Sequence, residues 1–144
     1  LLRNFLVLLL TYLCRMELIS THVCKSSDIG MNENMFGGRM LSLIDESAGA
    51  FAAQICDTPR MVTVKMDECS FRHTVRIGNL IKIYGKIHTI GNASITLHVE
   101  ARRHSVYTGD QKAVVSTLIK FCRIDEDGNP IPISERVKKK HGFV

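Results

Sequence analysis

The sequence predicts an α+β domain in which an antiparallel five-stranded sheet carries one long helix. Helical periodicity extends over a single long stretch, from about Arg39 to Cys56, and Pro59 ends it. The other hydrophobic segments alternate between apolar and polar residues, which is typical of half-buried strands. A length of 144 residues with 45% hydrophobic residues is sufficient for one domain with one core.

The helix is expected to be buried along one face. At about 100° per residue, its apolar side chains form one continuous arc. Arg39, Glu46 and Gln54 lie off this arc, whereas the acidic Asp45 lies on it. The arc consists of Met40, Leu41, Ile44, Ala48, Phe51, Ala52 and Ile55.

Strands are expected on both sides of the helix. The first covers Glu17 to Lys25, where apolar or β-branched residues alternate with polar neighbours. Four further strands are expected after Pro59. In each of them, every second residue is apolar or β-branched, and these residues are expected to lie on one face of the sheet. These residues are Val62, Val64 and Met66; Ile81, Ile83 and Ile87; Ile95, Leu97 and Val99; and Val115, Thr117, Ile119 and Phe121.

Short turns are expected between these strands. Gly78-Asn79 and Gly91-Asn92 are predicted to be hairpin turns, and the segment 127–130 is predicted to end the last strand. A sheet with a helix on one face leaves its other face open and its edges unpaired. This architecture therefore predicts dimerisation by edge or face pairing.

The net charge of +5 suits a polyanionic partner. Much of the excess lies in Arg102-Arg103 and in the tail 136–141, and the tail is expected to be solvated. Aromatic residues are not interleaved with these basic residues as a stacking platform for bases requires, so no nucleic-acid partner is expected.

The cysteines and histidines argue against disulfide and metal chemistry. The five cysteines are odd in number and include no C-x-x-C pair, so reduced thiols and a cytoplasmic location are expected. The six histidines show no H-E-x-x-H spacing. The sequence therefore predicts no metal site, and Cys56 and Cys69 are expected to pack in the interior rather than act as nucleophiles.

The apolar run from Phe5 to Leu13 is too short to span a bilayer, so no membrane span is expected. It lacks a cleavage site, and the chain begins with Leu1, so the native start is expected at Met16. The expected organisation is an apolar extension over residues 1–15, one domain over 16–134 and a basic tail over 135–144.

Asp45 is the most informative candidate residue. Its helical neighbours are Leu41, Ala48, Gly49 and Ala52, so it faces an apolar surface of small residues. Desolvating a carboxylate is costly unless donors or cations reach it, and small residues leave room beside it for a ligand. The alternative is a structural carboxylate, neutralised by an arginine or by backbone amides of a neighbouring subunit.

Gly37 and Gly38 open the same helix. The first N–H groups of a helix have no partner within the helix, and the helix dipole is positive there. Without side chains, a carbonyl group can approach these amides closely, as an oxyanion hole requires. A plain turn is the alternative interpretation of this pair.

Four stretches of the sequence combine in a specific order and spacing. They are Phe36-Gly37-Gly38 followed by Leu43-Ile44-Asp45-Glu46; Val62-Thr63 with Asp67 and Ser70-Phe71; Gly91-Asn92-Ala93-Ser94 with Val99-Glu100; and Phe121 to Pro132. By these stretches, the chain from about Met16 to Ser134 resembles the acyl-CoA thioesterases of the hot-dog fold, also called acyl-CoA hydrolases.

The resemblance implies a five-stranded sheet wrapped around the central helix, homodimers that assemble into a trimer of dimers, and active sites shared across the dimer interface. It implies that Asp45 is the catalytic carboxylate, acting as general base or as nucleophile, and that Gly37 and Gly38 polarise the thioester carbonyl. The turn of Gly91, Asn92, Ala93 and Ser94 corresponds to the family's contact with the phosphates of coenzyme A. Coenzyme A is then part of the substrate, and no cofactor is required.

The sequence departs from the family pattern at Gly30, where many relatives carry an Asn that positions substrate or water. Asn32 is the candidate to take over this role, with Asn34 as the alternative. His73 and Asn79 also differ from the family, at positions that affect a turn more than the chemistry. Because of Gly30, a non-catalytic module that binds acyl-CoA is the alternative function.

Overall fold

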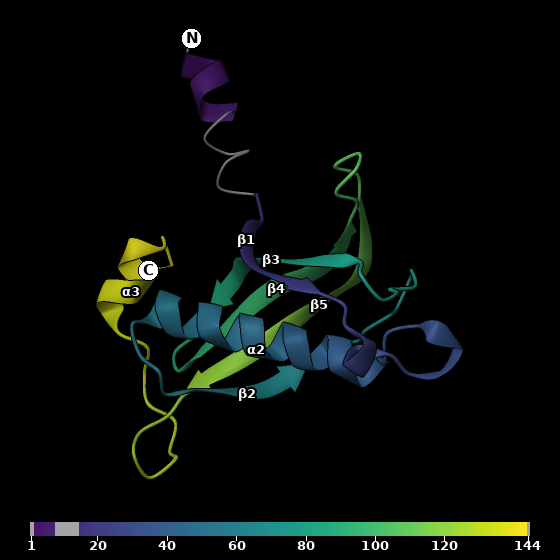
Figure 1. Cartoon of the computed structure of the whole chain (residues 1–144). Helices are drawn as coiled ribbons and strands as arrows, with labels where there is room; N and C mark the ends of the chain where they lie inside the picture. Colours follow the sequence, from purple (N-terminus) through teal and green to yellow (C-terminus); the bar gives the residue numbers. More distant parts are fainter. Residues whose placement is uncertain (1, 8–14, 144) are drawn as a thin grey trace.

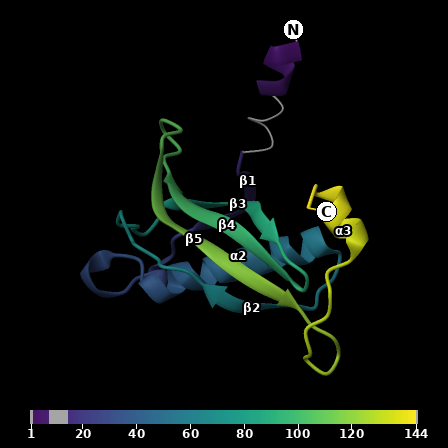
Figure 2. The same cartoon turned by 180° about the vertical axis from the view of Figure 1, so that it is seen from behind.

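The computed structural model describes residues 2–7 and 15–143, and its main body is one curved antiparallel sheet with a long helix across one face (Figures 1 and 2). The 5-stranded sheet has the order β1-β3-β4-β5-β2, so β1 and β2 are its edges. The strands are β1 (Glu17–Val23), β2 (Met61–Met66), β3 (Leu80–Ile90), β4 (Ser94–His104) and β5 (Gln111–Arg123). The helices are α2 (Gly37–Cys56), α3 (Glu135–Lys140) and two short 3₁₀ turns, η1 (Ser26–Asp28) and η2 (Met31–Glu33). Residues 2–7 are also helical.

The predicted α+β architecture is confirmed. Each predicted strand is present, and α2 begins two residues earlier than the periodicity indicates, at Gly37. The turn at 91–94 joins β3 to β4, as predicted, and the segment 127–130 forms a turn after β5.

The prediction of a hairpin at Gly78-Asn79 is wrong. β2 pairs with β5, whereas β3 pairs with β1 and β4, so the strands on either side of this turn are not neighbours. Gly78 has a φ of 84°, and its N–H donates to the carbonyl of Cys24 at 2.8 Å. The turn leads into β3, and this hydrogen bond attaches it to the residue that follows β1.

The core lies between α2 and the concave face of the sheet. Ala48 and Ala52 are fully buried, and their small side chains allow the helix axis to approach the strands. Leu43 and Ser47 are buried as well, while Leu41 is only half-buried, so the buried face is displaced from the predicted arc. The sheet side of the core includes Ile81, Ile83, Ile95, Leu97, Val99, Ile119 and Phe121.

The segment predicted to be a solvated basic tail begins with the helix α3. The Ser134 hydroxyl caps it by accepting a hydrogen bond from the N–H of Val137 at 3.3 Å. Val137 is fully buried, and Arg136 forms an ion pair with Asp57 at 2.6 Å, just beyond the end of α2. This helix is therefore docked on the domain.

Val137→Ala tests this docking. The substitution removes two buried methyl groups and leaves a cavity, so we expect it to lower the free energy of unfolding by about 2 kcal/mol. Lys139→Ala on the exposed side of α3 is the matched control, with an expected change within about 0.5 kcal/mol. Urea denaturation followed by circular dichroism measures both. Equal effects of the two substitutions would contradict the docked arrangement.

Candidate functional site

Asp45 lies in the middle of α2 and is half-buried beside the edge strand β2. The Thr63 hydroxyl on β2 donates a hydrogen bond to Asp45 Oδ1 at 2.7 Å. No Lys, Arg or His among the described residues forms an ion pair with this carboxylate. The structural alternative, neutralisation by an arginine, is therefore not realised within the described part of the chain.

The edge of β2 beside Asp45 is open. β2 pairs only with β5, so the hydrogen-bonding groups along its other side face away from the sheet. Val62 and Val64 are 38% and 53% exposed on the same strand. An open edge with exposed valines next to a hydrogen-bonded carboxylate is a surface on which a second molecule can pack.

The start of α2 presents unpaired donors. Phe36 caps the helix only through its carbonyl, which accepts the N–H groups of Arg39 and Met40 at 2.9 and 3.1 Å. The N–H groups of Gly37 and Gly38 donate to no acceptor within the described residues. A Cβ added at Gly38 would lie 2.6 Å from Phe36 Cε1, so the glycine allows this ring to lie against the helix.

A hollow of about 260 Å³ lies beside this helix start. Gly37 and Met40 of α2 form one side, and Phe71, His73 and Val114 are among the residues that form the other. The amides at the helix start thus lie next to a space with both apolar and polar walls. The unpaired N–H groups suit the carbonyl end of a ligand.

Within one chain, the structure does not bring Asp45 and the helix start together. Asp45 lies eight positions after Gly37, and a rise of about 1.5 Å per residue places the two residues ~12 Å apart along the axis. A carbonyl group bound at the amides of Gly37 and Gly38 is therefore out of reach of the Asp45 carboxylate of the same chain.

The loop before α2 is held by a buried carboxylate, Asp28. Its oxygens accept hydrogen bonds from the Lys25 N–H and from Arg39 Nε, both at 2.8 Å. The Lys25 N–H first and the Arg39 guanidinium second keep the pKa of Asp28 below its usual value. Because Arg39 lies in the first turn of α2, this pair connects the loop to the start of the helix.

The two asparagines of this loop lie in different environments. Asn34 Oδ1 accepts the Val75 N–H at 2.9 Å, so this side chain holds the loop against the segment 67–79. Asn32 is exposed in η2 with a φ of 59°, and it has no hydrogen bond to Asp45 or Thr63 among the described residues. A catalytic role for Asn32 stays a prediction.

The turn of Gly91, Asn92, Ala93 and Ser94 lies at the same end of the sheet as the first residues of β2. Ser94 pairs with Cys122, and Cys122 pairs with Val62, the residue before Thr63. Two strand spacings of about 4.8 Å put the turn ~10 Å from β2. The Gly91 N–H donates to the Ser94 carbonyl at 2.7 Å, whereas the N–H groups of Asn92 and Ala93 are unused within the described residues.

The sequence analysis missed Thr63 as a site residue. Its stretch Val62-Thr63 was part of the family resemblance, but β2 is exposed and its alternation only indicates a strand. The hydrogen bond to Asp45 joins residues 18 positions apart, which no local pattern indicates.

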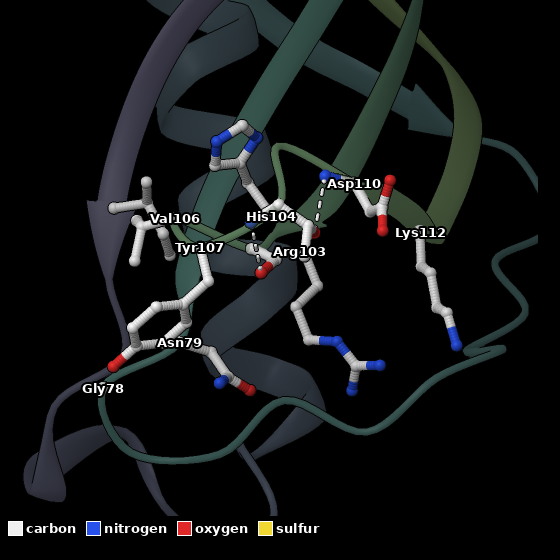
Figure 3. A pocket seen from close by; sticks show the side chains of 11 residues that line it. Gly78, Asn79, Arg103, His104, Val106, Tyr107, Asp110 and Lys112 are labelled. Carbon is white, nitrogen blue, oxygen red and sulfur yellow. Dashed lines mark hydrogen bonds between the residues drawn. The ribbon is translucent and has the colours of Figure 1, made fainter.

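Another hollow, near the opposite end of the sheet, is shown in Figure 3. It has a volume of about 370 Å³ and lies beside the hairpin between β4 and β5, with Tyr107 95% exposed. Arg103 at its border donates to the Thr74 carbonyl at 2.6 Å. Lys112 also lines it (Figure 3), whereas none of the candidate site residues does.

Cysteine and metal chemistry find no support in the described residues. Burial raises the pKa of the Cys56 thiol to about 11, which keeps it protonated at neutral pH. Cys14 lies outside the described residues. No group of three or more potential metal ligands occurs in residues 2–7 and 15–143. Over the same ranges, no helix has both the length and the apolar character that crossing a bilayer requires.

Two half-buried histidines belong to hydrogen-bonded groups. His22 Nε2 lies 3.0 Å from the Ser20 hydroxyl, which in turn lies 2.7 Å from the hydroxyl of the buried Ser47. His98 Nε2 lies 2.7 Å from the Ser116 hydroxyl on the face of the sheet opposite α2. Burial is the main cause that lowers the pKa of both imidazoles below 6.5.

Comparison with known proteins gives a consistent result. Residues 32–109 match the family model of the thioesterase superfamily. An uncharacterized acyl-CoA thioester hydrolase of Zymomonas mobilis is 31% identical over 99 residues, which are 69% of this chain and 66% of that protein. The cytosolic acyl coenzyme A thioester hydrolase of Rattus norvegicus is 29% identical over 118 residues, which are 81% of this chain but only 31% of the rat protein.

The fold comparison agrees. A crystal structure of a hexameric hotdog fold thioesterase of Campylobacter jejuni superposes with a TM-score of 0.76 and 34% sequence identity. The superposition covers 88% of this chain and 97% of the Campylobacter chain. The five-stranded sheet around one central helix is therefore the hot-dog fold that the sequence predicted.

The histidine environments predict a pH-dependent stability. The unfolded chain takes up protons at about pH 6.5, whereas folded His22 and His98 resist protonation, so stability is highest above pH 6.5 and falls as the pH decreases below it. We expect His22→Gln and His98→Gln each to flatten this decrease between pH 7.5 and 5.5. Urea denaturation at a series of pH values measures the slope. The exposed His73→Gln is the control, because His73 is not among the groups that shift the pKa of His22 or His98, and an equal flattening by this variant would contradict the assignment.

Proposed function

This chain belongs to the thioesterase superfamily, and from this premise we propose that it hydrolyses acyl-CoA thioesters to a free acid and coenzyme A. One observation carries the proposal. Asp45 is held by the Thr63 hydroxyl, has no cationic partner among the described residues, and faces an open edge of the sheet. A carboxylate in this setting is available for chemistry rather than committed to an ion pair.

Asp45 can act in either of two ways. As a general base, its carboxylate takes a proton from water, the hydroxide attacks the thioester carbon, and the thiolate of coenzyme A leaves and is then protonated. As a nucleophile, it displaces the thiolate to form a mixed anhydride, which water then hydrolyses to release the acid. In both routes negative charge develops on the carbonyl oxygen. Thr63 acts as a positioning residue because it holds one carboxylate oxygen and leaves the other free.

The oxyanion donors come from a second copy of the chain in this proposal. The amides of Gly37 and Gly38 lie ~12 Å along α2 from Asp45 of the same chain. Antiparallel pairing of two β2 edges would place the helix start of one copy beside Asp45 of the other. The open β2 edge and the hexameric state of the Campylobacter relative support this arrangement. A homodimer, extended to a trimer of dimers, is the proposed assembly.

Binding of acyl-CoA without hydrolysis is the second candidate function. Gly30 stands where many relatives carry an Asn, and Asn34 is occupied by the Val75 N–H. If Asn32 does not supply the missing amide, substrate would bind without turnover. We further propose a cytoplasmic location, in agreement with the name of the rat relative.

Asp45→Asn tests the catalytic assignment. The amide keeps the size of the side chain but is neither a base nor a nucleophile, so we expect kcat to fall by about 10²–10⁴-fold. Thr63→Val should lower kcat by roughly tenfold, since one hydrogen bond to a charged group is lost. The exposed neighbour Glu46→Gln is the control and should retain activity. Thiol release from acyl-CoAs of several chain lengths measures all three, and full turnover by Asp45→Asn would exclude the mechanism.

Mixing two inactive variants tests the shared site. Asp45→Asn removes the carboxylate, and Gly38→Val covers the amides of the helix start, so neither homodimer is expected to be active. After mixed refolding, half of the dimers are hybrids with one intact site each, so roughly one quarter of the wild-type activity should return. A site within one chain predicts no recovery. Size-exclusion chromatography of each variant must show the wild-type assembly for the comparison to hold.

A further inference from the structure

A group of two serines and a histidine lies between α2 and the edge strand β1, which lies beside the helix (Figure 1). Ser20 Oγ lies 3.0 Å from His22 Nε2 and 2.7 Å from the Oγ of the buried Ser47. Two positions along an α-helix differ by about 200° around its axis, so Ser47 points away from the flank of α2 that carries Asp45. The proposed thioesterase site therefore gives this group no role.

The same three residues line a cleft of about 280 Å³ between β1 and α2. Leu18 and Phe51 contribute apolar side chains to it, and the exposed Glu17 and Glu46 contribute carboxylates. The volume suits a small organic molecule. Because two carboxylates repel an anion, the cleft favours a neutral ligand with a small apolar group.

The cleft lies on the side of the sheet that the proposed dimer leaves free. The strand order β1-β3-β4-β5-β2 makes β1 and β2 opposite edges. Pairing of two β2 edges therefore leaves the β1 edge of each copy at the outside of the joined sheet. A ligand can reach the cleft without opening that interface.

His22 is able to take up a proton near neutral pH. Burial is the largest cause that keeps the pKa of its imidazole below 6.5. The positive charges of Arg39 and Lys25 act in the same direction, whereas the negative charges of Glu46 and Asp28 oppose them. At pH 7.5 the imidazole is therefore mainly unprotonated and can act as a base.

The hydrogen bonds prepare Ser20 Oγ for attack on a carbon atom. Ser20 and His22 are two positions apart on β1, so both side chains are on the same face of the strand. In the tautomer with the proton on Nδ1, His22 Nε2 accepts the Ser20 hydroxyl proton, and the Ser47 hydroxyl then donates to Ser20 Oγ. The oxygen is thus held between a donor and a proton acceptor, as an activated serine requires.

We propose that Ser20 is the nucleophile of a second site, which accepts the acyl group of small neutral carboxylic esters with His22 as general base. Ser20 Oγ forms a bond to the ester carbonyl carbon while its proton passes to His22 Nε2. The bond between this carbon and the alcohol oxygen breaks, and the alcohol oxygen takes the proton from the imidazole. Water then hydrolyses acyl-Ser20 to the free acid, with His22 again as base, and both side chains return to their first state. This inference is independent of the proposed acyl-CoA hydrolysis, because it uses no residue of that site.

A second serine–histidine pair is the competing location. His98 Nε2 lies 2.7 Å from the Ser116 hydroxyl, and burial lowers the pKa of this imidazole as well. The two residues belong to the paired strands β4 and β5, and neither of them lines the cleft beside β1. The pair shares the hydrogen bond of the proposed site but not its cleft. Ser116 is therefore the matched control for Ser20.

Reaction of the full chain with p-nitrophenyl acetate at pH 7.5 tests the proposal. We expect a rapid release of p-nitrophenolate of about one equivalent per chain, and peptide mapping by mass spectrometry should find one acetyl group on Ser20. Ser20→Ala should abolish both signals. His22→Gln should slow the acylation by about 10²-fold, because the general base is lost. Ser116→Ala should react as the wild type does.

Further variants separate chemistry from damage to the fold. Ser20→Cys keeps a nucleophile at this position and should restore the acetyl label there, and thermal unfolding of each variant checks the fold. Acyl-CoA hydrolysis by Ser20→Ala should equal that of the wild type, so the two activities are tested in separate assays.

Three outcomes would overturn the inference. Acetyl groups on lysines alone, with Ser20 unmodified, would make the cluster a structural hydrogen-bonded group. Loss of the label in Ser116→Ala but not in Ser20→Ala would move the site to the other face of the sheet. An unchanged rate of acylation in His22→Gln would refute the role of His22 as base.

Discussion

The rigidity of α2 is the constraint on which the candidate site depends. A straight helix holds its residues at set distances, so Gly37 and Asp45 stay ~12 Å apart along the axis for as long as α2 is intact. Both ends of this interval are held in place. Arg39 connects the helix start to the buried Asp28, and Asp45 is bound to Thr63 on the sheet. No rotation of side chains can close this gap, and for this reason the proposed mechanism takes its oxyanion donors from a second chain.

The open edge of β2 provides the place for that second chain. Exposed strand edges that carry apolar side chains favour association, and the valines on either side of Thr63 belong to such an edge. Covering this edge would also remove water from Asp45. In a less polar environment the carboxylate interacts more strongly with developing charge, and competing water is excluded. In the proposed dimer, assembly and activation of the carboxylate are therefore one event.

The predictability of the fold from the sequence depends on the range of the interactions involved. The helix from Gly37 to Cys56 and the alternation in β3, β4 and β5 are local patterns, so periodicity predicted them well. Strand pairing is not local, and for this reason Gly78-Asn79 was mistaken for a hairpin although β2 pairs across the sheet with β5. Val137 is one apolar residue among charged neighbours, so its burial, and with it the docking of α3, depends on tertiary contacts that no short window contains.

The same distinction applies to the site. Asp45 and the two glycines could be proposed as candidates because an acidic residue on an apolar arc and a glycine pair before a helix are visible in the sequence. Their separation along the helix also follows from the sequence, but the open edge of β2 beside Asp45 is visible only in the structure.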